Sequence, residues 1–339
     1  MLGVIFWDVS KEIGSYNLPF LGRPILWYGF FFAMGFFLGF VFLVYLLNRY
    51  FSQNPFFIKK ELINEEGIKA YLLEEKVPGK DLVIGLNTLL KKEDPLKKRL
   101  IIERRLKGLV LPLKNRAKAA AEKALVYALV GAVLGARLVD VFFYQDLVWV
   151  FKDPLSIFKI WEGGLASHGG TLGALLGLYI FAKKEKTLMP GLSFLGFLDF
   201  VCLPASIVAG CIRVGNFFNQ EILGTHTNVP WGVVFGHPID GSAPTIRHPV
   251  SLYESFFYFS LAVILFFYSK KHVNGKKQGS LVGVFLVLVF GFRFFIEFFK
   301  EEQSSAIHFN FFTVGQILSV PLICMGLFFF FKAKSHFVK

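Results

Sequence analysis

Long apolar runs alternate with shorter polar segments along most of this chain. Predominantly apolar runs occur at 27–47, 124–144, 167–182, 190–212, 250–268, 280–299 and 311–331. A helix rises ~1.5 Å per residue, so about 20 residues cross the ~30 Å hydrocarbon core of a membrane. The third run is short and rich in glycine, and we expect a tilted or broken helix there. The pattern predicts an all-α, polytopic membrane protein with seven transmembrane helices.

The basic residues indicate how these helices are oriented. The net charge of +13 would suggest a nucleic-acid partner in a soluble protein, but here the charges concentrate on one set of loops, and we expect no nucleic acid. The loops 48–123, 183–189, 269–279 and 332–339 hold 28 of the 37 Lys and Arg residues, and the alternate loops hold 7. Basic loops stay in the cytoplasm. The N-terminus is therefore predicted outside and the C-terminus in the cytoplasm.

The segment 48–123 differs from the rest of the chain. It is rich in Lys, Glu and Leu, and stretches such as KKEDPLKKRLIIERRLKGL are typical of amphipathic helices. One interpretation is a cytoplasmic insert that lies partly against anionic headgroups, and the other is a partner-binding surface. The sequence does not choose between them. We treat 1–339 as a single transmembrane domain that carries this insert.

Polar side chains gather at the predicted outer ends of the spans. Ionisable residues within a membrane are costly and usually face a bundle interior or a watery cavity. The set comprises Tyr28, Arg137, Asp140, His168, Arg213, Asn216, Asn219, His248, Tyr253, Glu254, Arg293 and Glu297, with Asp199 as a deeper exception. A transporter would place such groups near the midplane. The pattern favours an enzyme that acts on lipid headgroups or exported polypeptides at the outer leaflet.

Some of these residues also have a structural explanation. Arg137 and Asp140 are three residues apart, so they could neutralise each other on one helix face, and Arg293 and Glu297 could do the same at a spacing of four. His168 lies in GGLASHGGTLG, where flanking glycines permit close approach by a ligand or by another helix. Helix packing explains Gly173 and Gly177 well, but it explains the glycines at 163–164 and 169–170 less well.

The most informative cluster is RVGNFFNQEILG, which runs from Arg213 to Gly224 after the fourth span. A guanidinium can hold a phosphate through two parallel hydrogen bonds. Asn216 and Asn219 add amide donors and acceptors, and Glu221 can orient the arginine or accept a proton. A polar cap of the loop is the alternative, but the density of uncommon polar residues favours a phosphate site.

The motifs together resemble one family. WYG at Tyr28, GARLVDVFFY at Arg137, WEGGLASHGGTLG, RVGNFFNQEILG, RHPVSLYE and GFRFFIEFFK occur in the order found in prolipoprotein diacylglyceryl transferases, and they cover nearly all of the chain except 48–123. The resemblance implies an enzyme of the bacterial cytoplasmic (inner) membrane with a small extracytoplasmic head at about 214–247. It implies transfer of the diacylglyceryl group of phosphatidylglycerol to the lipobox cysteine of a preprolipoprotein signal peptide. Neither a metal nor a cofactor is expected.

Carried over residue by residue, the resemblance implies two groups of site residues. The catalytic group is His168, Arg213, Arg293, Glu297 and Tyr28, and the phosphatidylglycerol-binding group is Arg213, Asn216, Asn219, Glu221, Gly224, Arg137, His248 and Glu254. Three positions depart from the family pattern. Val289 and Phe290 stand where a tyrosine is usual, Lys300 replaces an arginine, and Gln220 replaces a common glycine.

The chemistry implied is displacement by a thiolate at a glycerol carbon. The leaving phosphate gains charge, so cations aimed at it lower the barrier, and Arg213 and Arg293 are the candidates. His168 is the candidate base or else positions the lipid headgroup, and the sequence does not choose between these roles; Glu221 or an arginine acting through water could be the base instead. A phosphotransferase would require Asp clusters for a divalent metal, and none is evident outside the spans. A transporter would require internal repeats and midplane polarity.

Overall fold

The structure is a computed structural model that describes residues 5–17, 24–53, 113–145, 153, 157, 164, 166–185, 188–189, 192–272, 278–301 and 312–333. The chain divides into two compact units. The first comprises Met1–Leu43 and Leu198–His336, and the second comprises Val44–Phe197 and Phe337–Lys339. Most of the predicted insert at 48–123, and Gly163, lie outside the described residues.

Within the described ranges, a helix occupies each predicted span. These helices are α1 (Trp27–Gln53), α6 (Leu113–Phe143), α8 (Ser167–Lys184), α9 (Phe194–Phe218), α10 (Val250–His272), α11 (Ser280–Ile296) and α12 (Val314–Lys332). Six of the helices in this part of the chain are long and apolar enough to cross a membrane, and α8 is not among them. Its glycines, His168 and two terminal lysines lower its hydropathy. The protein is a multi-pass membrane protein, and the seventh crossing stays a prediction.

Two helix ends differ from the predicted ones and change the setting of site residues. Helix α9 continues to Phe218 rather than ending at 212, because Phe217 and Phe218 pack their rings on Trp7 at 4.5 and 5.2 Å. Arg213 therefore lies inside the last turns of a membrane helix, not in a loop. Helix α11 ends at Ile296, and Glu297 is its C-cap and the first residue of the 3-10 helix η3 (Glu297–Phe299).

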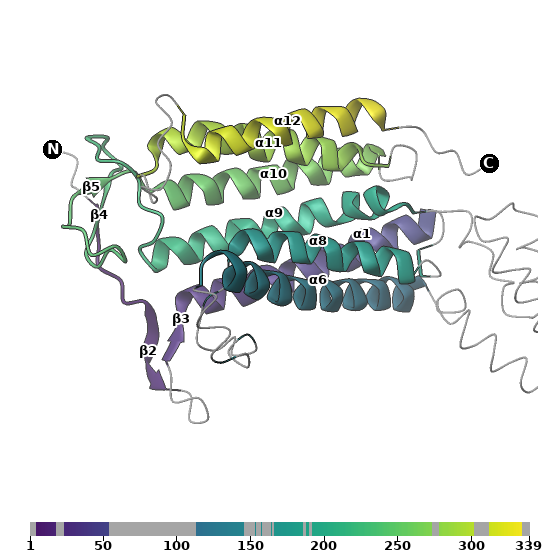
Figure 1. Cartoon of the computed structure of the whole chain (residues 1–339), viewed down its shortest axis with the longest axis horizontal. Coiled ribbons are helices and arrows are strands. Elements are labelled where there is room, and N and C mark those ends of the chain that lie inside the picture. The colour runs from purple at the N-terminus through teal and green to yellow at the C-terminus, as the bar shows by residue number, and fades with distance from the viewer. Residues whose placement is uncertain are drawn as a thin grey trace, which may run out of the picture. The chain divides into compact units, whose positions relative to one another are not determined.

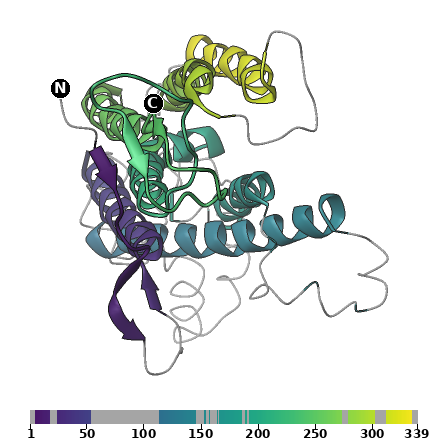
Figure 2. The same cartoon turned by 90° about the vertical axis from the view of Figure 1, so that its left-hand side faces the viewer.

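Short strands flank these helices, so the fold is mostly helical and the all-α prediction is incomplete. β1 (Ile5–Trp7), β4 (Val233–Phe235) and β5 (Ile246–Arg247) form one sheet in the order β1-β4-β5, while β2 (Glu12–Asn17) and β3 (Pro24–Leu26) form an antiparallel pair (Figure 1, Figure 2). β1 runs parallel to β4, with Trp7 opposite Phe235. The N-terminal segment thus adds a strand to the predicted head.

The helices of the first unit pack through aromatic and small residues. Figure 1 shows α10, α11 and α12 side by side. Phe257 of α10 stacks on Phe292 of α11 with ring centroids 3.9 Å apart. At the contact between α11 and α12, a Cβ on Gly283 would lie 2.6 Å from the backbone nitrogen of Phe330. Ser255 of α10 donates to the carbonyl of Gly210 on α9 at 3.1 Å, which links these two helices.

Asp199 has a structural role that its sequence position did not show. Its side chain, on α9, accepts hydrogen bonds from the backbone nitrogens of Gly279 at 2.7 Å and Val282 at 2.9 Å, so it caps the start of α11. The first N–H groups of a helix have no partner within the helix. A carboxylate from a distant helix satisfies two of them here.

Replacing Asp199 with alanine is expected to destabilise the protein by about 1–3 kcal/mol, because two buried N–H groups lose their acceptor. A lower thermal midpoint in detergent, with unchanged turnover at 25 °C, would confirm this. Asp240→Ala is the matched control. The backbone N–H of Ser242 lowers the pKa of Asp240 in an exposed turn, so its loss should change the midpoint little. Equal midpoints for the two variants would contradict the capping role.

Candidate active site

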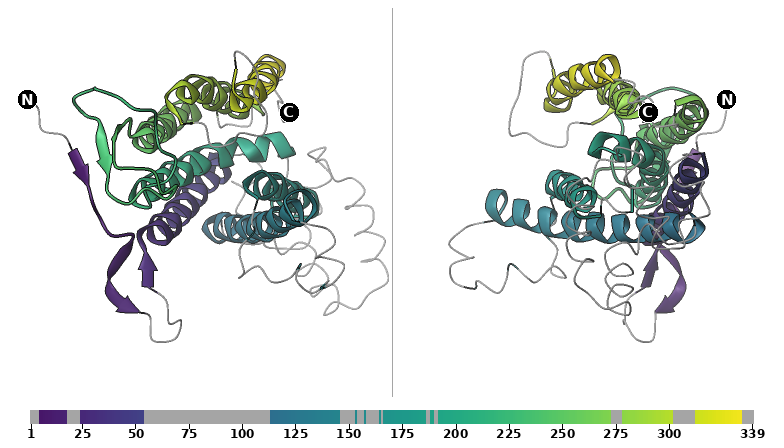
Figure 3. Two further views of the ribbon diagram at one scale, coloured as in Figure 1. Left: turned by 60° about the vertical axis from the view of Figure 1, so that its left-hand side comes forward. Right: turned by 90° about the vertical axis from the view of Figure 1, so that its right-hand side faces the viewer.

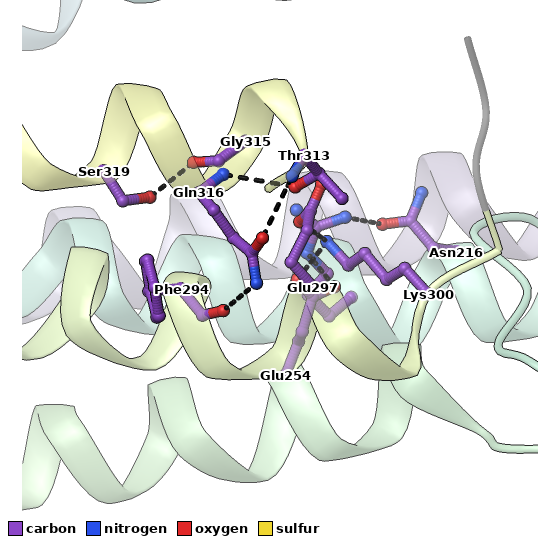
Figure 4. A network of polar contacts seen from close by, with 10 residues as sticks. Asn216, Glu254, Phe294, Glu297, Lys300, Thr313, Gly315, Gln316 and Ser319 are labelled. Carbon is purple, nitrogen blue, oxygen red and sulfur yellow. Dashed lines mark hydrogen bonds and ion pairs between the residues drawn. The ribbon is translucent and has the colours of Figure 1, made fainter. Parts of the chain in front are cut away.

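Polar side chains from four helices meet at one end of the first unit. Tyr28 lies in the first turn of α1, Arg213 and Asn216 in the last turns of α9, and Glu254 near the start of α10. Arg293 lies in the last turn of α11. Antiparallel neighbours bring the C-terminal end of one helix beside the N-terminal end of the next. The ends of helices that are distant in sequence therefore form one cluster, part of which is drawn in Figure 4.

Arg213 is held by two neighbours. Its Nε lies 3.0 Å from Oε2 of Glu254, and one terminal nitrogen donates to Oδ1 of Asn216 at 3.2 Å. Its charge also acts on the hydroxyl of Tyr258. The side chain of Glu254 is 5% exposed and that of Arg213 is 22% exposed. The ion pair is thus largely shielded from water, where a charge interaction is stronger than at the surface.

Glu221 orients the amide of Asn216. Oε2 of Glu221 accepts from Nδ2 of Asn216 at 3.3 Å, and Oε1 accepts a short hydrogen bond from Asn219. Because the nitrogen of the Asn216 amide faces Glu221, its oxygen faces Arg213. Tyr28 is close enough for the charges of Arg213 and Glu221 to act on its hydroxyl. These contacts bring together the RVGNFFNQE cluster and Tyr28, as the sequence predicted.

Lys300 joins two carboxylates of the cluster. Its Nζ lies 2.8 Å from Oε1 of Glu254 and 3.9 Å from Oε2 of Glu297 (Figure 4). Glu254 is therefore shared, with one oxygen on Lys300 and the other on Arg213. Glu297 also fits against the start of α12, where a Cβ on Gly315 would lie 2.7 Å from its carboxyl carbon.

The proposed structural pair of Arg293 with Glu297 is not formed. Glu297 has left the α-helix and pairs with Lys300 instead. The charge of Arg293 acts on the Tyr258 hydroxyl, as that of Arg213 does. Among the described residues, the Arg293 guanidinium has no carboxylate and no hydrogen-bond partner. A charged group in a membrane helix without a partner is costly, so the absence of a partner for Arg293 within the described residues calls for an explanation.

Gly224 and His248 contact each other beside this cluster. A Cβ on Gly224 would lie 2.7 Å from the Cβ of His248, so packing alone requires glycine there. The Nδ1 of His248 lies 3.2 Å from the hydroxyl of Tyr253, and that hydroxyl accepts from Nε1 of Trp231 at 2.7 Å. His248 is therefore oriented by Tyr253, as a supporting residue would be.

Arg137 belongs to the second unit and holds the segment that precedes α8. It donates to the carbonyls of Ile157 at 3.0 Å and Gly164 at 3.2 Å, and it lies 3.6 Å from Asp140. The expected pairing with Asp140 is thus confirmed. Gly164 has φ +70°, and a Cβ there would lie 2.8 Å from the Arg137 guanidinium, so both conformation and space require glycine.

His168 is exposed and is the second residue of α8, also in the second unit. Figure 3 shows α6 and α8 side by side. A Cβ on Gly169 would lie 2.6 Å from Val139, whereas one on Gly170 would meet nothing nearer than 3.6 Å. Helix packing therefore explains Gly169, contrary to the sequence interpretation. It does not require glycine at Gly170, where a Cβ would make only ordinary van der Waals contacts with α6.

Three contributors to the cluster were missed or underrated in the sequence. Tyr258 and Trp231 carried no motif signal, although Tyr258 follows Glu254 by four residues and so shares its helix face. Lys300 was noted only as a departure from the family pattern. Its amine reaches two carboxylates without the fork of an arginine.

Comparisons with known proteins agree with these motifs. The family described as prolipoprotein diacylglyceryl transferase matches residues 100–332. A protein of Protochlamydia amoebophila named phosphatidylglycerol–prolipoprotein diacylglyceryl transferase is 35% identical over 356 residues, covering 96% of this chain and 94% of its own length. A protein of the same name from Chlamydia pneumoniae is 33% identical to this chain, and the match covers 99% of each chain. Another, from Chloroherpeton thalassium, is 34% identical, and the match covers 98% of this chain and 95% of that protein.

Proposed function

The chain belongs to the prolipoprotein diacylglyceryl transferase family, and from this premise we propose that it transfers the diacylglyceryl group of phosphatidylglycerol to the lipobox cysteine of a preprolipoprotein. The products are a thioether-linked prolipoprotein and glycerol phosphate, and the reaction is the first step of bacterial lipoprotein maturation. One observation supports the site most directly. Arg293, without an anionic partner among the described residues, shares the neighbourhood of Tyr258 with Arg213.

The cysteine thiol must first lose its proton, because the thiolate is the nucleophile. The thiolate then attacks the glycerol C3 carbon of the lipid. A sulfur–carbon bond forms, the carbon–oxygen bond to the phosphate breaks, and glycerol phosphate leaves with the bonding electron pair. Its phosphate gains negative charge in the transition state. Arg213 and Arg293 would bind that phosphate and stabilise the added charge.

The neighbours of Arg213 favour this role for it. Glu254 engages only its Nε, and Asn216 accepts from one terminal nitrogen. The guanidinium carries five N–H donors in a fixed fork, so donors remain for a phosphate after these contacts. Lys300 occupies the second oxygen of Glu254, which keeps that carboxylate from binding both sides of the Arg213 fork.

The proposed topology has seven spans, with the N-terminus outside, the C-terminus in the cytoplasm of a bacterial cytoplasmic membrane, and the site toward the outer leaflet. The distribution of lysine and arginine supports it. Within the first unit, Lys270 and Lys332 lie at the opposite ends of α10 and α12 from Glu254 and Gly315. The segment 214–247 would then be an extracytoplasmic head and 48–123 a cytoplasmic insert.

Purified enzyme with acyl-labelled phosphatidylglycerol and a lipobox peptide tests this function. Label should move to the peptide, and glycerol phosphate should be released in equal amount. A peptide with Cys→Ser at the lipobox should accept no label. Transfer that persists in a chelator would exclude a phosphotransferase that depends on a divalent metal, whereas release of phosphate without labelled peptide would contradict the proposal.

His168 is the proposed base, and this assignment makes its own prediction. His168→Gln is expected to lower kcat about 100-fold or more, since general bases contribute roughly 10²–10⁴, while phosphatidylglycerol binding stays close to that of the natural enzyme. Binding of a short-chain phosphatidylglycerol, measured by calorimetry, gives the second quantity. Loss of lipid binding would assign His168 to headgroup recognition and leave Glu221 as the candidate base.

A further inference from the structure

Glu221 lies between two residues in a backbone conformation that side chains rarely adopt. Gln220 has φ 55° and Ile222 has φ 57°. Non-glycine residues seldom have positive φ, and for a β-branched residue such as Ile222 this is a clear outlier. Strain of this kind is costly and persists only where surrounding contacts impose it. The contacts that impose it here can be identified.

Gln220 is anchored to the later part of the head segment, at His237 and Ile239, by both its backbone and its side chain. Its backbone oxygen accepts from Ile239 at 3.2 Å, and its Oε1 accepts from the backbone nitrogen of His237 at 2.6 Å. The residue is 0% exposed. The segment 236–239 is in turn held by the N-terminal segment. The backbone nitrogen of Gly236 donates to the backbone oxygen of Trp7 at 2.9 Å, and the side chain of His237 lies 2.9 Å from that of Asp8.

The turn at Gln220 brings Glu221 back toward α9. The backbone nitrogen of Glu221 donates to the oxygen of Asn216 at 3.0 Å, and its carboxylate holds the side chains of Asn216 and Asn219. Asn216 in turn accepts from Arg213 at 3.2 Å. A continuous series of hydrogen bonds thus leads from the head through Gln220 and Glu221 to the phosphate-binding arginine.

We propose that Gln220 is a positioning residue, whose left-handed backbone turns Glu221 onto Asn216 and so orients Arg213, while its side chain secures this conformation to the head. This inference rests on the proposed function. The backbone conformation and the side-chain anchor of Gln220 can be tested separately. The backbone conformation is expected to affect kcat, and the side-chain hydrogen bond is expected to affect thermal stability. Glycine reaches positive φ at no steric cost but lacks the anchor, whereas alanine also lacks the anchor and still carries the steric cost of a Cβ at positive φ.

Turnover and thermal stability of Gln220→Ala and Gln220→Gly, measured with the labelled lipid and lipobox peptide, test this. In Gln220→Ala, kcat should fall about tenfold or more, because small displacements of positioning groups cost up to ~100-fold. Its KM for phosphatidylglycerol should change less, since the phosphate charge grows in the transition state. In Gln220→Gly, kcat should stay within about threefold of the natural value. Both variants should melt at lower temperature, because His237 loses its acceptor.

Gly241→Ala is the matched control for strain in the head. Gly241 has φ +71°, and a Cβ there meets no atom within 4 Å, so alanine strains the head without touching Glu221. It should lower the melting temperature and leave kcat unchanged. A merely structural role for Gln220 would make kcat and melting temperature fall together in all three variants, and that result would overturn the proposal.

Other outcomes are equally decisive. If kcat of Gln220→Ala equals that of the natural enzyme, Gln220 has no positioning role and the proposal is overturned. If that variant does not fold, Gln220→Gly decides alone, and loss of its turnover overturns the inference. A natural enzyme that transfers no label contradicts the proposed function instead. In that case the affinity for short-chain phosphatidylglycerol is measured in place of kcat. The natural protein and Gln220→Gly are expected to bind this lipid with similar affinity, and Gln220→Ala is expected to bind it more weakly.

Discussion

Arg213→Lys is expected to lower kcat/KM for phosphatidylglycerol by roughly 100- to 1000-fold, the usual cost of removing one preorganised donor from a developing anion. In the structure, one guanidinium reaches Glu254 and Asn216 together. A lysine ammonium is a point charge without the planar fork. It can pair with Glu254 but cannot also present two parallel donors to a phosphate.

The measurement is steady-state transfer of labelled diacylglycerol to a lipobox peptide, with lipid concentration varied. Arg49→Lys is a matched control, because it makes the same chemical change on α1 away from the cluster and should leave kcat/KM unchanged. Near-natural turnover by Arg213→Lys would refute the two-donor clamp. The remaining role of Arg213 would then be simple charge neutralisation, which lysine can provide.

Arg293→Met is expected to show a larger loss of turnover together with a gain in stability. Arginines that stabilise a transferring phosphate contribute about 10³–10⁵ to kcat in other enzymes, so a loss of roughly 1000-fold is expected here. Stability should rise, because the guanidinium has no anionic partner among the described residues and its desolvation is uncompensated. Methionine has a similar length and no charge.

Arg213→Met provides the contrast. Removing Arg213 leaves Oε2 of Glu254 without its ion pair, although the side chain of Glu254 is only 5% exposed. Breaking a buried pair by removing one partner is destabilising. The thermal midpoint should therefore rise in Arg293→Met and fall in Arg213→Met, while both lose activity. A fall in both variants would mean that Arg293 has a structural partner, and the argument that it is reserved for a ligand would fail.

The sequence determined the helical membrane architecture because it depends on local quantities. The length of each apolar run sets whether a helix can cross a bilayer, and a helix was found at every predicted span. The motifs also predicted residues that lie together, since Arg213, Asn216, Glu221 and Glu254 form one cluster. Motifs show which residues are present, but they do not show which side chains those residues contact.

Tertiary structure alone decided which charges are paired. Spacing suggested that Arg293 pairs with Glu297, yet the helix ends at Ile296 and Lys300 takes that carboxylate. Asp199 likewise looked like an isolated charge in a span until it was found to cap α11 from 80 residues away. Coulomb energies and hydrogen bonds depend on distance through space. Distances between helix ends that are remote in sequence are set by packing, which no local pattern records.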